Sequence, residues 1–337
     1  MKRIYLILSV FSILFISCET DVDVNAQWEE IVVVYGLLDQ DQELQFVKVN
    51  KAFLGDDAAY IMAQQSDSFN LHYEYPDAII VSLHELNGQD TAWTRVLRDT
   101  ILEREEIDDP IFATDNNVVY YLETNQGELN KDREYVLTVE NTQTGNFVYS
   151  KTELVPPFTF DDFDGTSGSI GNPTPAKLNF HQWNQDQEAN TAVSKFEWYD
   201  YDDAAIFQFG LRFHYKEDGE DKSIYWRQSE VYEDIEKMFL YGNDFCNFLE
   251  SNLDADGSSR EFISIDIEMT VGSQDLKTYV LVNKPSTSIV QERPQFSNIQ
   301  NGIGLFSSRY SLLIENIDLS PTTYDYLRDS IPEYNFQ

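Results

Sequence analysis

The sequence predicts a mainly β protein: an N-terminal immunoglobulin-like β-sandwich, followed by a second antiparallel β-rich domain with a few short helices. Three observations support this. Short runs of β-branched and aromatic residues are separated by turn residues, segments of the C-terminal half alternate between apolar and polar residues, and one leucine–tyrosine pattern is typical of sandwich corners. With 42% hydrophobic residues, 22 Phe and 20 Tyr, the chain can bury real cores.

The first residues predict a lipoprotein signal peptide over 1–17. Lys2 and Arg3 precede the apolar stretch 4–16, which as a helix would rise only ~20 Å, short of the ~30 Å hydrocarbon core. The small Ser17 then stands before Cys18. We expect cleavage before Cys18, a diacylglyceryl thioether on its sulfur and an acyl chain such as palmitate on its amine. The alternative is that Cys18 merely ends a signal that is cut elsewhere.

Residues 18–27 are polar and acidic, and they predict a tether between lipid and protein. Acidic residues directly after the cysteine resemble the surface-export signal of Bacteroidota-type lipoproteins, which implies an outer-membrane protein that faces the cell exterior. The chain has 59 acidic and 23 basic residues, a net charge of −36. Such a charge excludes nucleic acid as a partner and argues against electrostatic docking to anionic lipid, so we expect membrane attachment through the acyl chains.

The predicted sandwich occupies residues 28–157. The β-branched run 31–35 predicts a strand that is buried on both faces or lies at a sandwich core, and in the next run Leu44 and Phe46 fall on one side. Further strand-like runs follow at 78–86, 93–102, 118–123, 135–139 and 147–155. Asn87-Gly88 and Gly145-Asn146 predict hairpin turns because such residues accept positive φ. Residues 58–65 predict a partial helix within a long surface loop.

One pattern strengthens the sandwich prediction. Leu129 lies six positions before Tyr135, which begins the alternating Tyr-x-Leu-x-Val. This spacing resembles the tyrosine corner of immunoglobulin and fibronectin type III domains, where the tyrosine hydroxyl bonds back to the upstream backbone.

Pro156-Pro157 predicts the end of the first domain, and residues 158–176 predict a linker. The second domain, 177–337, is predicted to begin with strands at 177–183 and 195–201. Residues 205–216 then alternate strictly, with the buried face formed by Phe207, Phe209, Leu211, Phe213 and Tyr215. Ile263, Ile265, Ile267 and Met269 are expected to share one face in the same way. Gly219 predicts a hairpin turn, Gly242-Asn243 the cap of a short helix carrying Phe245, Phe248 and Leu249, and Ser320-Pro321 the start of another.

The chain resembles an uncharacterised family of Bacteroidota lipoproteins annotated only as a domain of unknown function. The resemblance rests on the acylated start, the segment VVVYGLLDQDQELQFVKVNKAFLG (32–55) and the segment PQFSNIQNGIGLFSSRYS (294–311). It implies an outer-membrane lipoprotein, often found with TonB-dependent transporters, and it supplies no catalytic residue. In the second segment, residues 301–306 predict a glycine-rich turn into a strand, where two backbones approach closely.

The search for a chemical site predicts no catalytic residue, no cofactor and no metal. His72, His84, His181 and His214 are scattered, residues 165–169 lack the last glycine of a nucleophile elbow, and Cys246 lies on an apolar stripe, where a buried thiol is expected. Residues 252–257 match the first half of a calcium loop, but its twelfth position is Ile263 rather than glutamate. Trp183, Trp198 and Trp226 could stack on a glycan, although strand aromatics are more often core.

Three functions from different classes stay open. The favoured one is a non-enzymatic binding or accessory module with a protein partner in the outer membrane, for which an exposed apolar patch or an unpaired edge strand would be evidence. The second is a surface hydrolase acting on glycans or peptides, which requires a cleft with paired carboxylates or a metal. The third is a structural or adhesive envelope protein.

Overall fold

The structure is a computed structural model of the full chain. It describes residues 31–52, 70–75, 77–103, 117–125, 127–164, 177–183, 189–198, 203–232, 237–284 and 295–337. Residues Ile31–Gln337 form one compact unit. The described chain is mainly β, as predicted, and its buried apolar side chains gather in two clusters.

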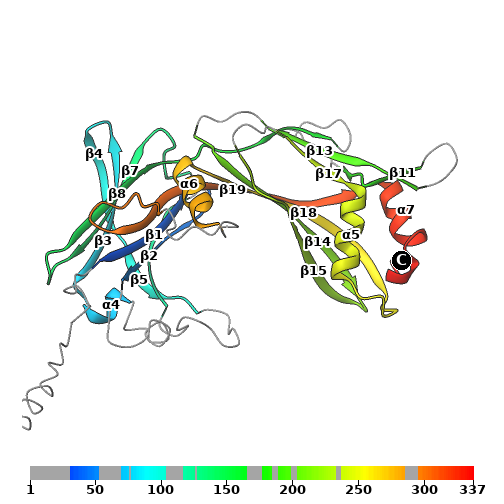
Figure 1. Ribbon diagram of the computed structural model, residues 1–337, viewed down its shortest axis with the longest axis horizontal. Coiled ribbons are helices and arrows are strands. Elements are labelled where there is room, and N and C mark those ends of the chain that lie inside the picture. Colours follow the sequence, from blue (N-terminus) through cyan, green and yellow to red (C-terminus); the bar gives the residue numbers. More distant parts are fainter. Residues whose placement is uncertain are drawn as a thin grey trace, which may run out of the picture. The chain divides into compact units, whose positions relative to one another are not determined.

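The largest sheet of the described chain joins strands from both halves of the sequence. Its main order is β15-β14-β18-β19-β1-β2-β6-β5. The bounds are β1 Val32–Asp39, β2 Leu44–Lys51, β5 Arg98–Ile101, β6 Val118–Glu123, β14 Ile206–Glu217, β15 Glu220–Arg227, β18 Arg260–Gly272 and β19 Ile303–Leu319. β19 pairs in parallel with β1 and in antiparallel fashion with β18. This one long strand therefore joins the N-terminal strands of the sheet to the C-terminal ones (Figure 1). The short strands β10 (Lys177–Leu178) and β16 (Val231–Tyr232) pair with β19 and β14.

A second, four-stranded antiparallel sheet packs over β1, β2 and β6 of the large sheet. Its order is β4 (Asp90–Val96), β3 (Ile79–Asn87), β7 (Glu134–Asn141) and β8 (Phe147–Glu153). The two sheets share the smaller hydrophobic cluster, which includes Val34 and Val47 on one side and Leu83 and Leu137 on the other. Sheet-on-sheet packing is therefore present. The immunoglobulin-like topology is not confirmed, and the parallel neighbour of β1 comes from the C-terminal end of the chain.

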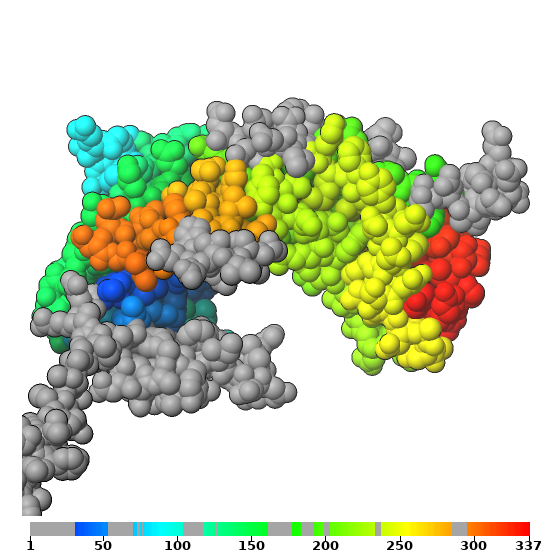
Figure 2. All heavy atoms as spheres, viewed as in Figure 1, coloured from blue at the N-terminus to red at the C-terminus, as the bar shows by residue number. Residues whose placement is uncertain are grey.

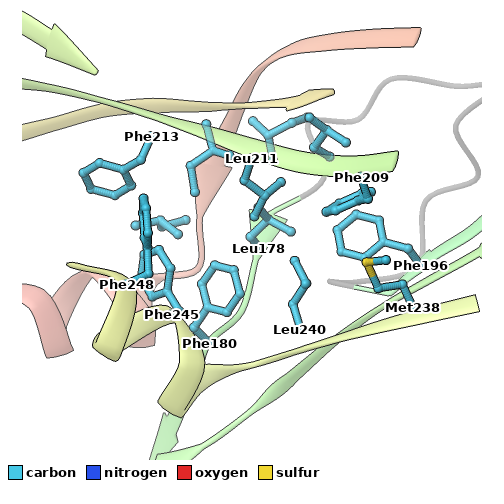
Figure 3. Packing of buried hydrophobic residues seen from close by; sticks show 14 of the residues in the cluster. Leu178, Phe180, Phe196, Phe209, Leu211, Phe213, Met238, Leu240, Phe245 and Phe248 are labelled. Carbon is cyan, nitrogen blue, oxygen red and sulfur yellow. The ribbon is translucent and has the colours of Figure 1, made fainter. Parts of the chain in front are cut away.

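The larger cluster is rich in aromatic rings. It lies between β14 and β18 of the large sheet and a three-stranded sheet of β17 (Lys237–Tyr241), β13 (Val193–Trp198) and β9 (Phe160–Asp164). Figure 3 shows Phe209 beside Phe196, with ring centroids 4.6 Å apart. The rings of Phe180 and Phe245 stack with centroids 4.1 Å apart, and Phe213 lies 6.0 Å from Phe245. Phe158 and Phe160, which the sequence assigns to the linker, are also buried in this core.

The remaining elements are short. β11 (His181–Trp183) pairs with β12 (Ala189–Thr191), and the helices are α4 (Leu71–Glu74), α5 (Gly242–Asn252), α6 (Gln274–Asn283), α7 (Pro321–Asp329) and a 3-10 turn at Pro332–Tyr334. α7 begins as predicted, because the Ser320 side chain accepts a hydrogen bond from the Thr323 N–H. No helix among the described residues is long and apolar enough to cross a membrane.

Several local predictions are confirmed. Gly88, Gly145 and Gly219 have positive φ in the turns β3–β4, β7–β8 and β14–β15. The Tyr135 hydroxyl accepts a hydrogen bond from the Asn130 N–H at 2.7 Å and donates one to Glu85, and Leu129 is buried, as the corner pattern predicts.

Three predictions need correction. Ile263 does not share a face with Ile265, because a β-bulge opposite His214 and Tyr215 turns Phe262 inward and leaves Ile263 exposed. The cap of α5 is Tyr241, which makes no side-chain cap hydrogen bond, and the helix itself starts at Gly242. Of the two alternatives for the run 31–35, burial on both faces is wrong, since Tyr35 is exposed, and a place at the core between two sheets holds, since Val32 and Val34 are buried there. The predicted helix at 58–65 lies outside the described residues.

Candidate binding face

The outer side of the large sheet carries exposed apolar side chains on neighbouring strands. Leu44 and Phe46 of β2, Tyr35 of β1 and Ile303 of β19 each expose between 38% and 44% of their surface. With Tyr121 of β6, these residues are called the apolar face below. Atoms of the first two strands (blue) reach the surface in Figure 2, below the orange atoms of the segment near residue 300.

Strand register places these side chains on the same side of the sheet. Phe46 lies opposite Tyr121, and Ile303 lies opposite Val33, two residues from Tyr35. Because directly paired residues point to the same face, these side chains lie on one side of the sheet. Lys48, the partner of Tyr35 on β2, lies among them, and Leu305, the partner of Tyr35 on β19, is buried. The alternate residues Val34, Val47 and Val49 point into the core instead.

Glycines bring β19 close enough to β1 to complete this face. Gly304 has φ +124°, and a side-chain carbon there would lie against the backbone of Val34. Gly302 is similar, with the Val32 carbonyl oxygen 2.7 Å from that position. This is the close backbone approach that the glycine-rich segment predicts.

Polar groups lie at the edge of the apolar face and also within it. Arg98 of β5 lies over the ring of Tyr121 with its guanidinium carbon 4.9 Å from the centroid, and it pairs with Glu123. Lys48 of β2 donates hydrogen bonds to the Val118 carbonyl (2.7 Å) and to Asn117. Apolar surface with polar groups at its rim is the usual anatomy of a protein interface.

Tyr35 also contacts helix α6. Its ring packs edge-on against Tyr279 at a centroid distance of 6.0 Å, with the two hydroxyls 3.5 Å apart. Burial, together with this hydroxyl contact, raises the pKa of Tyr35 to about 12. Tyr35 therefore stays neutral near pH 7 and presents a ring with a hydrogen-bonding tip.

Apart from the apolar face, a polar hollow of about 440 Å³ lies over β14, β15 and β18. His214 Nε2 is 2.7 Å from Asp266 Oδ2, and Asp266 Oδ1 accepts the Asn316 N–H at 3.0 Å. The sequence predicts His214 on the solvent face, and the structure shows it half-buried and oriented by a carboxylate. Ser223 and Ser264 flank it in the register, but within the described chain neither hydroxyl bonds the imidazole. The arrangement can move a proton, and it contains no prepared nucleophile.

Cys246 is half-buried rather than part of the core. Its sulfur lies 3.1 Å from His181 Nε2, and the His181 ring stacks on Tyr326 at 3.5 Å. Burial raises the pKa of the Cys246 thiol to about 11 and lowers the pKa of His181 to about 4. At pH 7 the pair is a neutral thiol beside a neutral imidazole, which is the opposite of an activated cysteine.

The other candidates have structural partners. Asp256 of the calcium-like segment accepts the Ser258 N–H at 3.0 Å and lies 3.4 Å from Arg260, as in an ordinary Asx turn. Trp198 is buried, and Trp226 stacks on Phe248, so both belong to the core, as the commoner interpretation of strand aromatics predicts. Cys18, residues 165–169 and the Trp183 side chain lie outside the described part of the chain.

No family model and no curated protein matches this chain. The structure therefore provides the evidence for function. The sequence places Leu44 and Phe46 on one side of a strand, but does not show that this side faces solvent. Only the pairing of β2 with β1 and β6 shows that two aromatic side chains, the exposed Tyr35 and the half-buried Tyr121, lie on the same face as Leu44 and Phe46.

Proposed function

We propose that this chain is an outer-membrane lipoprotein, anchored through Cys18 and facing the cell exterior, that acts as a non-enzymatic binding or accessory module. Its partner is a protein of the same membrane, such as a TonB-dependent transporter. The observation that carries the proposal is the apolar face, on which β1, β2 and β19 present exposed aliphatic and aromatic side chains beside the half-buried Tyr121 of β6.

The energetics favour a protein partner. Complete burial of such a side chain from full exposure is worth roughly 1.5–3 kcal/mol. Because about two fifths of Phe46 and Tyr35 is still exposed, a partner that covers them gains about 1 kcal/mol from each, and Tyr121 adds less. Together these residues would form the centre of the interface. Arg98 at the rim, Lys48 beside Tyr35 and the tyrosine hydroxyls supply orientation.

The length of the tether favours a partner in the same membrane. Twelve residues, 19–30, separate Cys18 from Ile31, where the described chain begins. Thirteen residue steps span at most ~45 Å when fully extended. Because β1 begins at Val32, an anchor at Cys18 keeps the start of this strand, which carries Tyr35 of the apolar face, within about this distance of the acylated residue.

We also propose that the N-terminal sandwich has an immunoglobulin-like fold. Two facing sheets and the Tyr135 corner support it.

The test is recovery of the partner from native membranes. The full lipidated chain, purified from detergent-solubilised outer membranes, is compared with Phe46→Asp and with the control Phe147→Asp. Phe147 is a fair control because it is equally exposed (45% against 38%) but lies on β8 of the other sheet. We expect Phe46→Asp to reduce the co-purified protein at least tenfold, since a buried charge opposes the interface, and Phe147→Asp to leave it unchanged.

Equal recovery with both variants contradicts the proposal. So does purification of the chain alone together with hydrolysis of envelope glycans or peptides. That result would favour the surface hydrolase, for which the His214–Asp266 pair is the relevant observation, and a His214→Gln variant would then lose the hydrolysis.

A further inference from the structure

The strand β15 ends the large sheet. Its eight residues pair with β14 along their whole length, and no other described strand pairs with them (Figure 1). Its remaining edge therefore presents backbone N–H and C=O groups that only water or another chain can satisfy.

The hairpin geometry shows which groups face outward. Glu217 and Glu220 close a two-residue turn in which Asp218 and Gly219 both have positive φ. In such a turn the closing residues exchange backbone hydrogen bonds, so the even-numbered residues of β15 bond to β14. The Gln228 N–H, which donates to the Phe209 carbonyl, continues this pattern. The backbone groups of the odd-numbered residues 221, 223, 225 and 227 therefore point away from the sheet.

We propose that two copies of this chain pair through β15 in antiparallel fashion, joining their large sheets across a two-fold axis at Ile224. In this register Asp221 lies opposite Arg227 of the second copy, and Ser223 lies opposite Tyr225. Both are hydrogen-bonded pairs, because all four residues point their backbone groups outward. Four residues of each copy thus exchange backbone hydrogen bonds with the other copy.

The side chains are complementary in this register. Asp221 and Arg227 form two symmetric ion pairs on the polar face. In the single chain Arg227 donates hydrogen bonds to Gln208 Oε1 (2.7 and 3.0 Å) and lies 3.4 Å from Glu230, and its side chain is 65% exposed, so pairing with Asp221 of the second copy exchanges these solvent-exposed contacts for the new ones. On the other face Lys222 lies opposite Trp226, where a cation and an aromatic ring attract each other. Ile224 meets its own copy at the axis.

The charges on this edge select a second copy over an arbitrary strand. Charged residues on an edge strand normally prevent pairing, because most incoming strands leave them desolvated or opposed. Here the acidic and basic ends of β15 become neighbours when the same strand is inverted. If the second copy shifted by one residue along β15, its side chains would point to the wrong face of the sheet. If it shifted by two residues, Asp221 would lie opposite Tyr225 and both ion pairs would be lost.

The test is a symmetric disulfide in the full lipidated chain in its own membrane. Ile224→Cys places two thiols in a non-hydrogen-bonded pair, where Cα atoms lie about 4.5 Å apart, within the range that a disulfide spans. The control is Ile101→Cys on β5, the exposed strand at the opposite end of the same sheet. Under mild oxidation we expect at least tenfold more covalent homodimer from Ile224→Cys. The native Cys246 thiol is protected by its raised pKa.

Charge reversal tests the register. In the Ile224→Cys background, Arg227→Asp or Asp221→Arg alone places like charges together and should reduce the homodimer at least tenfold. Co-expression of the two reversed chains with different tags should restore a heterodimer, because both ion pairs re-form with inverted sign. Lys151→Asp on β8 is the matched control, because Lys151 is an equally exposed cation (67%) on the other sheet, and it should have no effect.

Three results would overturn the proposal: no excess of dimer over Ile101→Cys, a dimer that charge reversal does not change, or a disulfide to a different protein. Restored heterodimer formation would show that the single variants fold, so loss of the homodimer cannot be attributed to misfolding.

Discussion

Replacing Gly304 by alanine tests whether the parallel seam between β1 and β19 depends on a missing side chain. Gly304 has φ +124°, which L-residues rarely adopt. A methyl group there would meet the Val34 backbone, with its carbonyl carbon at 2.9 Å and its nitrogen at 3.0 Å, as well as the carbonyl oxygen. Because these atoms are backbone, neither strand can give way without breaking the ladder.

The expected cost has two parts. A residue held in a sparsely populated backbone conformation costs about 1–3 kcal/mol, and overpacking adds about 1–3 kcal/mol. We therefore expect Gly304→Ala to lose about 2–6 kcal/mol. Gly88→Ala is the matched control, because Gly88 also has positive φ (+66°) but nothing lies within 4 Å of the new carbon. It should lose only about 1–2 kcal/mol.

Thermal unfolding of the two variants measures the difference. At roughly 2–4 °C per kcal/mol for a domain of this size, Gly304→Ala should unfold about 4–24 °C below the wild type, and Gly88→Ala about 2–8 °C below it. If Gly304→Ala unfolds at or above the temperature of Gly88→Ala, the close approach of the two strands is refuted.

Three further outcomes are expected. Tyr135→Phe should lose about 1–3 kcal/mol in urea unfolding, because it leaves the buried Glu85 without a donor, whereas Tyr149→Phe at an exposed position should lose almost nothing; equal losses would contradict the corner. His181 has a pKa lowered by burial to about 4, so the unfolded chain takes up its proton below pH 6.5 while the folded chain does not. The wild type should therefore lose roughly 2 kcal/mol between pH 6.5 and 5 that His181→Gln retains, and identical urea midpoints against pH would reject this. Alkylation of Cys246 by iodoacetamide, followed by mass spectrometry, should at pH 8 be on the order of 100-fold slower than for an ordinary cysteine and rise about tenfold per pH unit toward 11; a rate that levels off near pH 8.5 would contradict the raised pKa.

Features that depend on neighbouring residues could be predicted from the sequence. The alternation Phe207 to Tyr215 shows its buried face directly, because an antiparallel strand with one wet face repeats every two residues. The Tyr135 corner, the Ser320 cap of α7 and the positive-φ glycines are also local, and the structure confirms them.

Features that depend on distant pairing could not. The exposure of Tyr35 is hidden in the run of valines before it, which fits a strand buried on one face as well as on two. Its parallel neighbour β19 begins about 270 residues later. The prediction for Ile263 is wrong for a similar reason, since the bulge that turns this residue outward arises from the pairing of β18 with β14. The apolar face exists only after four strands from separate parts of the chain assemble.

The claim on which the proposed function depends is the anchor at Cys18. The most direct test is the mass of the N-terminal peptide from protein extracted from native outer membranes. We predict that the chain starts at Cys18 and carries a diacylglyceryl group on the sulfur and an acyl chain on the amine. An unmodified Cys18, or a peptide that retains residues 1–17, would contradict the account.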